Sequence, residues 1–589
     1  MNKDKMKQLI RDMSREGLQQ MLFEILEASL PGYQEEWDRL LIRHSGDVAE
    51  ASVASVRPRR MSQELVDEKI EQINHWLEQI DCGELCLSSY GYEDYSLGYW
   101  DREWCWEYSD PENIGEKVAV AIAFAEDCVN DCRYEEAFTL YEKVLELNVW
   151  TQENDSECCE AVDLETMVSE NLLSADLKRM AKYALYAVYQ AANVEERAER
   201  IYSLYQYAMF RDVQLQDMFL VGREELQEQD VFWKDWIQVL EKASGEMESR
   251  LLKEAVLLYE GAEGLARIAE QNYATHPSLC RSVMEEYARE KAWSNMQSFG
   301  QRALNHIDVK LVIRGEIAMQ TAFAASCLDN RELERAYCYE AFRSHTTVKN
   351  YLRLFSERRM AEQYGVKAKS VMEERETYWD RAEVSYGICG HNREFDQNTV
   401  DSDTYHELLF LTGEFDKIKA QCKNPKGSLG WSGKFIGQGI KLFLLYLCES
   451  AKPGKAIASI CSDLRLDELS EDKNQILSVE REITEDSQLK EISVGWNLLQ
   501  RWKEYYPMEE EQKVKYLSWL EKIVYQRADA VVSGQHRGTY GAVARLLAAV
   551  GEVKESRGQQ MARQGIYGTY KSKFPRHSSF QAEMRRYFQ

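Results

Sequence analysis

Proline and glycine are scarce in this sequence. Its 589 residues include only 8 prolines and 31 glycines, so few positions force a turn or stop a helix. Strong helix formers fill the intervals, and we expect long helices joined by short turns. A chain of this length exceeds what one compact core accommodates, which favours two or more domains or one elongated array.

Long apolar runs are absent as well. No segment approaches the roughly 20 apolar residues that a membrane-spanning helix needs, and residues 1–7 lead into an amphipathic segment rather than an apolar signal core. We therefore expect no membrane association and a cytoplasmic location. The 14 cysteines are scattered and mostly fall within helical patterns, which indicates small buried side chains in a reducing compartment.

Positive charge is in short supply. The 73 Lys and Arg residues are outnumbered by 100 Asp and Glu residues, and the formal net charge is -27. This balance disfavours a general nucleic-acid or membrane coat and leaves basic partners open. Because 44% of the residues are hydrophobic, general disorder is not expected either.

The clearest structural pattern lies in Ala119–Leu147. Apolar residues recur there at three- and four-residue steps on both sides of a polar turn at Asn130–Arg133, which predicts a helical hairpin. Small residues at the crossing let two helices approach closely, while Phe124 and Tyr141 fill the groove on either side. One hairpin cannot bury such a stripe alone, so the pattern predicts neighbouring hairpins.

Further hairpins of this kind follow along the chain. Leu177–Met209 repeats, at Ala198–Tyr202, the Ala–Tyr spacing of Ala137–Tyr141, and Leu279–Leu304 with Val312–Ser344 has the same small-residue crossings. We therefore predict an all-α fold of stacked helical hairpins, an α-solenoid. The expected domains are an N-terminal helical segment and linker at 1–62, helical repeats at 63–360, and a C-terminal helical domain with a basic tail at 361–589.

The hairpins resemble tetratricopeptide (TPR) repeats. Ala125, Tyr134, Ala137 and Tyr141 stand at small and aromatic positions of that motif, whereas its usual glycine and closing proline are absent. The resemblance implies a TPR-like array that holds extended peptides or a partner protein.

An aromatic and acidic stretch covers Leu87–Pro111. Its rings alternate with Asp and Glu residues, a composition suited to cationic or peptide ligands. The competing interpretation, which we favour, is a long connection that covers the end of the helical stack with its own rings. The candidate partner-binding residues are Tyr92, Tyr95, Tyr99, Trp100, Trp104 and Trp106.

The charge reverses in the tail from Arg557 onward. Basic residues are interleaved there with Tyr and Phe rings, as in surfaces that contact a nucleic-acid backbone and stack on bases. The same tail could dock on the acidic body, and in a protein of this net charge we favour docking. The candidate nucleic-acid-binding residues are Arg563, Lys571, Lys573, Arg576, Arg585 and Arg586.

No catalytic or cofactor motif is recognisable. The stretch around Ser428–Lys434 resembles a phosphate loop, but its spacing is one residue too long and Phe435 stands where Ser or Thr would bind magnesium. His406-Glu407 lacks the second histidine of a zinc helix. We therefore predict no enzyme, no cofactor and no metal site.

The C-terminal two thirds is similar to the helical region of bacterial SWIM zinc-finger proteins. That finger needs Cys-x-Cys and Cys-x-His pairs, and this chain has only Cys389-Gly-His391, so the resemblance implies the helical scaffold without the finger. The strings that carry it are Ala341–Ser344, Asn350–Leu354, Gly430–Ser432, His536-Arg537 with Tyr540, and Tyr570–Arg576 with Phe580.

Together these features predict a non-enzymatic protein-binding scaffold or adaptor with an unidentified protein partner. One alternative is a nucleic-acid-associated protein that works through the basic tail. Another is a helical regulator or substrate of a separate enzyme.

Overall fold

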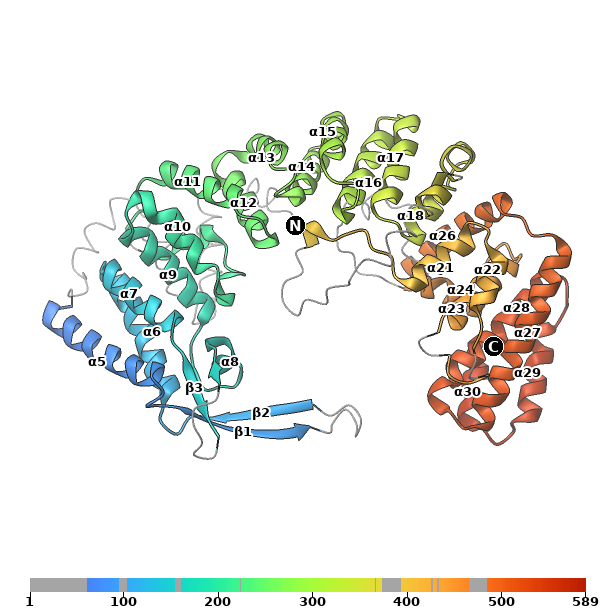
Figure 1. The fold of residues 1–589 in the computed structure, drawn as a ribbon, viewed down its shortest axis with the longest axis horizontal. Helices are drawn as coiled ribbons and strands as arrows, with labels where there is room; N and C mark the ends of the chain where they lie inside the picture. The colour runs from blue at the N-terminus through green and yellow to red at the C-terminus, as the bar shows by residue number, and fades with distance from the viewer. Residues whose placement is uncertain are drawn as a thin grey trace, which may run out of the picture. The chain divides into compact units, whose positions relative to one another are not determined.

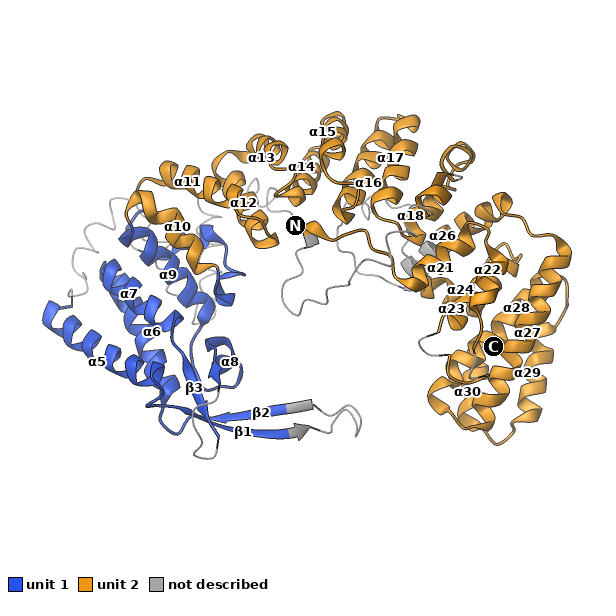
Figure 2. Cartoon of the chain, in the orientation of Figure 1, with its two compact units in different colours: residues 1–192, 206–226 blue, residues 193–205, 227–589 orange. Residues whose placement is uncertain are grey.

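The computed structural model describes residues 61–94, 103–153, 160–222, 224–365, 367–372, 393–424, 427–431, 434–464 and 485–588. Helices dominate these residues, as the sequence predicts (Figure 1). Contacts divide the chain into two compact units (Figure 2): unit 1 holds residues 1–192 and 206–226, and unit 2 holds residues 193–205 and 227–589. The predicted domain boundaries near residues 62 and 360 stay predictions.

Unit 1 is built on helices α5, α6, α7 and α9, which pack against one another beside a small sheet. Its elements are α5 (Gln63–Asp81), β1 (Leu87–Asp94), β2 (Glu103–Ser109), α6 (Ile114–Asn130), α7 (Tyr134–Leu145), β3 (Val149–Gln152), β4 (Ala161–Val162), α8 (Leu164–Ser169), α9 (Leu177–Ala191), and the short helices η2 (Ala208–Phe210) and η3 (Leu215–Leu220).

Unit 2 is a series of helices with short connections. It begins with α10 (Val194–Leu204), α11 (Gln229–Lys242), α12 (Glu246–Tyr259), α13 (Gly261–Gln271), α14 (Pro277–Arg289), α15 (Trp293–His306), α16 (Val312–Cys327), α17 (Arg331–Ser344), α18 (Val348–Arg353), α19 (Arg358–Met360), η4 (Ala361–Gly365) and η5 (Arg393–Phe395). It continues with α21 (Ser402–Leu411), α22 (Phe415–Gln421), α23 (Ile436–Leu447), α24 (Lys455–Asp463), α26 (Glu485–Tyr505), α27 (Glu510–Ser533), η7 (Arg537–Thr539), α28 (Tyr540–Ser556), α29 (Ala562–Lys573) and α30 (Ser578–Phe588).

The helices from α11 to α17 stack in chain order. Each contacts the next along the chain, and α12 and α14 also contact the second helix along, α14 and α16 respectively. Close crossings depend on small residues: a Cβ on Gly300 of α15 would lie 2.0 Å from Thr321 Oγ1 of α16. The predicted hairpins at Ala119–Leu147, Leu279–Leu304 and Val312–Ser344 are confirmed. The helices of Leu177–Met209 form too, but α9 and α10 belong to different units.

The hairpins share one turn. Cys132, Lys291 and Asp329 follow α6, α14 and α16 with left-handed φ values of 61°, 58° and 56°. In each turn the next N–H donates to the carbonyl oxygen five residues earlier, at 2.8–2.9 Å. This left-handed cap usually carries glycine, because a Cβ destabilises it by about 1 kcal/mol. The turn geometry is therefore repeated where its sequence signature is missing.

Unit 1 also contains a small four-stranded sheet, which the helical patterns of the sequence did not predict. Its strand order is β2-β1-β3-β4, with β1 antiparallel to β2 and parallel to β3, and β3 antiparallel to β4. The stretch at Leu87–Pro111, for which we favoured a long connection over a binding surface, thus contains a β-hairpin. Its rings alternate at two-residue steps, which is the period of a strand rather than of a helix.

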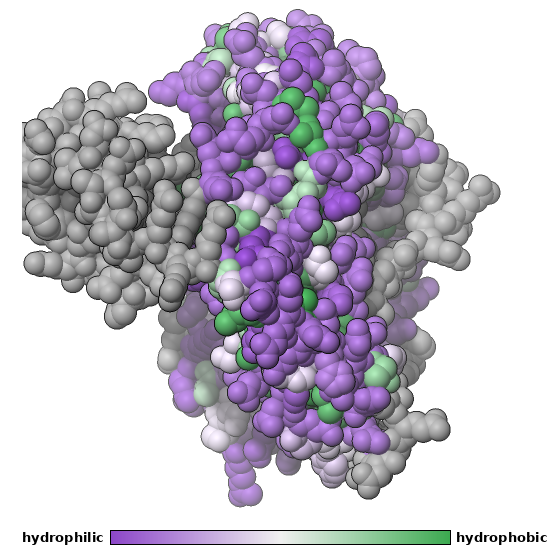
Figure 3. All heavy atoms as spheres, turned by 90° about the vertical axis from the view of Figure 1, so that its left-hand side faces the viewer, coloured by the Kyte–Doolittle hydropathy of each residue, from purple (hydrophilic) through white to green (hydrophobic). Residues whose placement is uncertain are grey.

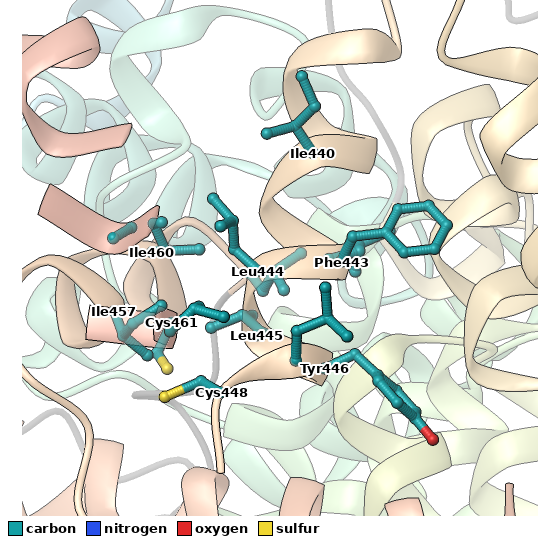
Figure 4. Close-up of a cluster of buried hydrophobic side chains, with 14 of the residues drawn as sticks. Ile440, Phe443, Leu444, Leu445, Tyr446, Cys448, Ile457, Ile460 and Cys461 are labelled. Carbon is teal, nitrogen blue, oxygen red and sulfur yellow. The ribbon is translucent and has the colours of Figure 1, made fainter. Parts of the chain in front are cut away.

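The C-terminal helices share one apolar core with α18 and α21–α24. In Figure 4, Ile457, Ile460 and Cys461 of α24 lie beside Leu444 and Leu445 of α23, and these five side chains are at most 1% exposed. Among the described helices, none combines the length and apolar character that a membrane span requires. On the side that Figure 3 shows, the described atoms are mostly hydrophilic, with hydrophobic residues in small separate patches.

Candidate functional site

The β1–β2 hairpin presents two tyrosines on one face. Tyr90 pairs with Glu107 and Tyr92 with Cys105, and directly opposed residues share a face of the sheet. The Tyr90 and Tyr92 rings are stacked at 6.5 Å with an interplanar angle of 18°, and their residues are 61% and 36% exposed. We call Tyr90, Tyr92 and Glu107 the hairpin surface.

The opposite face of the hairpin carries a tryptophan. Trp106 pairs with Gly91 and is 37% exposed, whereas Leu87 and Ser89, nearer the base, are buried. The interpretation that the rings of this stretch pack inward is therefore wrong for Tyr90, Tyr92 and Trp106. Strand alternation places Tyr92 and Trp106 on opposite faces, so they do not form one continuous surface.

Other predicted partner-binding residues cannot be placed on this surface. Tyr95, Tyr99 and Trp100 lie outside the described residues. Trp104 is part of β2, but its side chain lies outside them too.

Polar groups anchor the hairpin to α6. The Asp110 carboxylate accepts hydrogen bonds from the N–H groups of Ile114 and Gly115, both at 2.8 Å, and so satisfies free donors at the first turn of the helix. A Cβ on Gly115 would lie 1.8 Å from the carbonyl oxygen of Leu172, so this position requires glycine. Burial and the negative charges of Glu160 and Glu170 raise the pKa of Tyr108 at the hairpin base.

A polar pocket of about 450 Å³ lies at the turn between α6 and α7. Its tyrosine is already bonded: Tyr134 Oη donates to Glu224 Oε2 at 3.0 Å, and burial raises the Tyr134 pKa. Its arginine is bonded as well, since Arg133 donates to Asp131 at 3.0 Å and to the carbonyl oxygen of Met61 at 2.9 Å. The pocket residues are Asp131, Cys132, Arg133, Tyr134, Glu135, Glu136, Gln190 and Ala191. Sequence patterns did not reveal this pocket, because Gln190 and Ala191 come from α9.

A serine, a histidine and a glutamate meet in the interior of unit 2. Ser249 Oγ lies 2.7 Å from His276 Nδ1 and 2.8 Å from Glu394 Oε2, and the three residues are 2%, 0% and 3% exposed. A hydrolytic triad needs the histidine between the serine and the acid. Here the serine is in the middle, and His276 Nε2 lies 3.0 Å from the Leu240 carbonyl oxygen. The order of these groups does not suit nucleophilic catalysis.

The basic tail is folded onto the body as α29 and α30, which contact α28. Three of its rings, Tyr570, Phe574 and Phe580, are at most 7% exposed and belong to the apolar core, so they are not available to stack on bases. The predicted docking of the tail is thus confirmed.

The six candidate cations of the tail differ in their surroundings. Arg563 bonds to Glu555 at 2.6 Å and Lys573 pairs with Asp529 at 2.7 Å. Lys573 is exposed despite this pair, and so are the other four cations. Lys571 lies 5.8 Å from the Tyr567 ring centroid, Arg586 is 3.9 Å from Glu583, and the remaining two are Arg576 and Arg585.

The glycine-rich loop before α23 is fixed to the body by an arginine. Arg527 of α27 donates to the carbonyl oxygen of Ser428 at 2.9 Å, and its guanidinium lies 5.0 Å from the centroid of the buried Trp431 ring. Ser432 and Gly433 lie outside the described residues, as do Cys389 and His391. Within the described part of the chain, no cluster of three or more His, Cys, Asp or Glu side chains could hold a metal ion.

Comparison with protein-family models gives no match for this chain, and a search of curated proteins finds no relative.

Proposed function

We propose that the protein is a non-enzymatic protein-binding scaffold whose partner docks on the hairpin surface. The observation that carries the proposal is the stacked, exposed ring pair of Tyr90 and Tyr92 on a two-stranded ribbon. Tyrosine supplies a large contact area with little loss of side-chain freedom on binding, which is why it is frequent at binding hot spots.

The charge of the surface indicates the chemistry of the partner. Glu107 lies directly opposite Tyr90 and is exposed, in a chain of net charge -27. A Lys or Arg side chain placed over the rings would gain a cation–π contact and a nearby carboxylate. The partner that we propose is therefore a protein with a basic segment, and electrostatic attraction would speed its association at low salt.

Substitution at the hairpin surface tests this proposal. Full-length wild-type protein and Tyr90→Ser/Tyr92→Ser protein are used to isolate partners from the native host, with Leu220→Ser as the matched control. Leu220 is 59% exposed in the same unit and lies outside the hairpin surface. We expect one basic partner to bind wild type and the control equally and the double variant at least about tenfold more weakly, the loss of roughly 1.4 kcal/mol. Equal binding of that partner to all three proteins would contradict the proposal.

We include in this proposal a cytoplasmic location and the resemblance of the helical array to TPR-like and SWIM-related scaffolds. Burial raises the pKa of the Cys128 and Cys422 thiols to about 12, which suits inert, reduced cysteines of a cytoplasmic protein. The stacked helices suit a TPR-like scaffold of the SWIM-related type without its finger. A zinc determination on the purified full-length protein tests the last point, because stoichiometric zinc would implicate Cys389 and His391.

Nucleic-acid association is the second candidate. Exposed cations on α29, on α30 and in the turn between them, including Lys571, Arg576 and Arg585, favour it. Filter binding of a single-stranded oligonucleotide tests it, because backbone contacts require an affinity that falls steeply with salt. Replacing these three residues by Gln should abolish such binding, and absence of binding at low salt would exclude this candidate.

A further inference from the structure

Residues 393–398 form a segment, here called the strap, that begins with the 3-10 helix η5 and continues as extended chain toward α21 (Figure 1). The N–H of Val312 donates to the Asp396 carbonyl oxygen at 2.9 Å, and the N–H of Asn398 donates to the Lys310 carbonyl oxygen at 2.7 Å. These bonds accompany an isolated antiparallel bridge between the strap and the residue that precedes α16. The strap is thus held by its main chain, as an added strand is held in peptide recognition.

Two side chains of the strap point into the helices. Glu394 and Asn398 are 3% and 5% exposed, whereas Asp396 between them is exposed. Asn398 Nδ2 donates to the Arg343 carbonyl oxygen at 2.9 Å, and Asn398 Oδ1 accepts from the N–H of Thr346 at 3.0 Å. Glu394 is bonded to serines of two other helices. A carboxyl group and, four residues later, a carboxamide are therefore the anchors.

The Glu394 anchor and the main-chain bridge lie near the starts of helices in successive hairpins, whereas the Asn398 anchor lies at the C-terminal end of α17. Ser249 is near the start of α12, Ser278 near the start of α14, and Val312 is the first residue of α16. Free N–H groups and the positive end of the helix dipole at these starts favour oxygen acceptors. The strap therefore uses the repetition of the array, as an extended peptide bound to stacked repeats does.

Hydrogen counting assigns the proton on Glu394. The Leu240 carbonyl oxygen can only accept, so His276 Nε2 carries a hydrogen. Burial lowers the pKa of His276 and so favours the neutral ring, whose Nδ1 then accepts from Ser249. The single hydroxyl hydrogen of Ser249 is then used, and the 2.8 Å bond to Glu394 requires a hydrogen on the carboxyl group. Ser278 donates to the other carboxyl oxygen. Burial raises the pKa of Glu394 to about 7, which agrees with a protonated acid.

The strap is bound by bonds that can exchange. None of its described side chains is a fully buried apolar group, and its one ring, Phe395, is only partly buried. Each hydrogen bond contributes a net of only about 1 kcal/mol, because water competes for the same groups. Removing the Glu394 carboxyl group from water opposes docking further.

We propose that the residues bonded to the strap form a peptide-binding site, the strap site, which the chain keeps occupied with its own residues 393–398. The site accepts a partner segment that, like the strap, presents a carboxyl side chain in a short turn and, four residues later, a carboxamide on extended chain. This goes beyond the proposed function, because the hairpin surface belongs to unit 1 and takes no part in the strap site.

A peptide offered in trans tests the proposal. The probe is a fluorescent peptide copying residues 393–400, and anisotropy measures its binding to full-length wild type and to full-length Glu394→Ala/Asn398→Ala protein. We expect the double variant to bind the peptide at least about tenfold more tightly, because its own strap no longer competes at high effective concentration. A peptide with the same two changes should not bind. The control protein Asp396→Ala/Thr399→Ala alters one exposed position of the strap and the exposed residue that follows it, and should behave as wild type.

Two outcomes would overturn the proposal. One is a folded double variant, with unchanged circular dichroism, that does not bind the peptide at millimolar concentration. The other comes from an experiment on wild-type protein alone, which does not depend on the folding of any variant. Excess peptide is expected to speed hydrogen exchange in residues 393–398 and to leave α14 protected. Unchanged exchange would mean that the strap is a permanent brace. Tyr90→Ser/Tyr92→Ser protein should bind the peptide as wild type does, so this test and that of the proposed function can fail separately.

The proton on Glu394 adds a pH dependence. Glu246, Glu248 and Arg281 also act on the carboxyl group, and His276 stays within the helices whether the strap is docked or released. Docking raises the Glu394 pKa from 4.5 to about 7, so docking takes up a proton and weakens as pH rises through this window. Peptide binding to the double variant should be about tenfold weaker at pH 8 than at pH 6. A peptide with Gln in place of Glu394 should bind equally at both pH values. Equal affinity of the unaltered peptide at pH 6 and pH 8 would contradict the proton assigned to Glu394.

Discussion

Two stretches of this chain interleave aromatic rings with charges, and they fold in opposite ways. In the β1–β2 hairpin, Tyr90 and Tyr92 remain exposed. In the basic tail, Tyr570, Phe574 and Phe580 are buried in the core of unit 2. Composition alone does not separate the two cases.

The spacing of the rings explains the difference. In the tail, the buried residues Ile566 and Tyr570 are four residues apart on one face of α29, which packs on α28, and Phe574, four residues further on, caps the end of that helix. In the hairpin the rings stand two residues apart on a ribbon whose faces are not both covered. A charged, aromatic stretch is therefore a candidate surface when its rings follow the strand period, and candidate core when they follow the helix period.

The largest expected effect comes from a ring of the tail. Phe580 is fully buried against the rings of Tyr540, Tyr570 and Phe574. Phe580→Ala should destabilise unit 2 by about 3–5 kcal/mol, because it leaves a cavity as well as removing apolar contacts. Hydrogen exchange of α28 amides in urea measures this change. A loss below about 1 kcal/mol would mean that the tail helices are not part of that core.

The helical part of this fold is largely predictable from the sequence, because three- and four-residue steps directly reflect burial on one face of a helix. The two-residue spacing of Tyr90 and Tyr92 is a strand signal that could have predicted the β-hairpin. The signal is short, and the rest of the chain shows helical spacing almost throughout. The strap was not predictable: Ser249 and Glu394 bond across 145 residues, and no local pattern encodes that distance. The pocket beside Tyr134 was unpredictable for the same reason, since its wall combines the α6–α7 turn with residues of α9 that are distant in the sequence.

The cysteine thiols of the hairpin and of the core of unit 2 should differ in their reactivity. Cys105 is partly exposed on β2, whereas Cys422 is 5% exposed and burial raises its pKa from 9 to about 12. A shift of this size makes the reactive thiolate of Cys422 about a thousandfold rarer. Timed alkylation with iodoacetamide and mass spectrometry should show Cys105 modified first and Cys422 only on unfolding. Similar rates at both sites in the native protein would contradict this contrast.

A polar anchor, rather than ring burial, should hold the hairpin in place. Asp110→Ala removes the carboxylate that accepts from the Ile114 and Gly115 N–H groups, and should destabilise unit 1 by about 1–2 kcal/mol. Asp110→Asn keeps one acceptor oxygen and should cost less. Hydrogen exchange in the first turn of α6 reports the change, and equal protection in wild type and Asp110→Ala would rule out this anchoring role.

The smallest effect on stability should come from the exposed rings themselves. Tyr90→Ser/Tyr92→Ser removes a stacked pair that is largely in water, so the free energy of unfolding of unit 1 should change by no more than about 0.5–1 kcal/mol. The same substitution is expected to weaken partner binding at least about tenfold. A surface that contributes to binding and little to folding is functional, whereas a loss of stability comparable to that of Phe580→Ala would show that these rings belong to a core after all. Urea unfolding monitored by hydrogen exchange of α6, with Leu220→Ser as control, decides between the two.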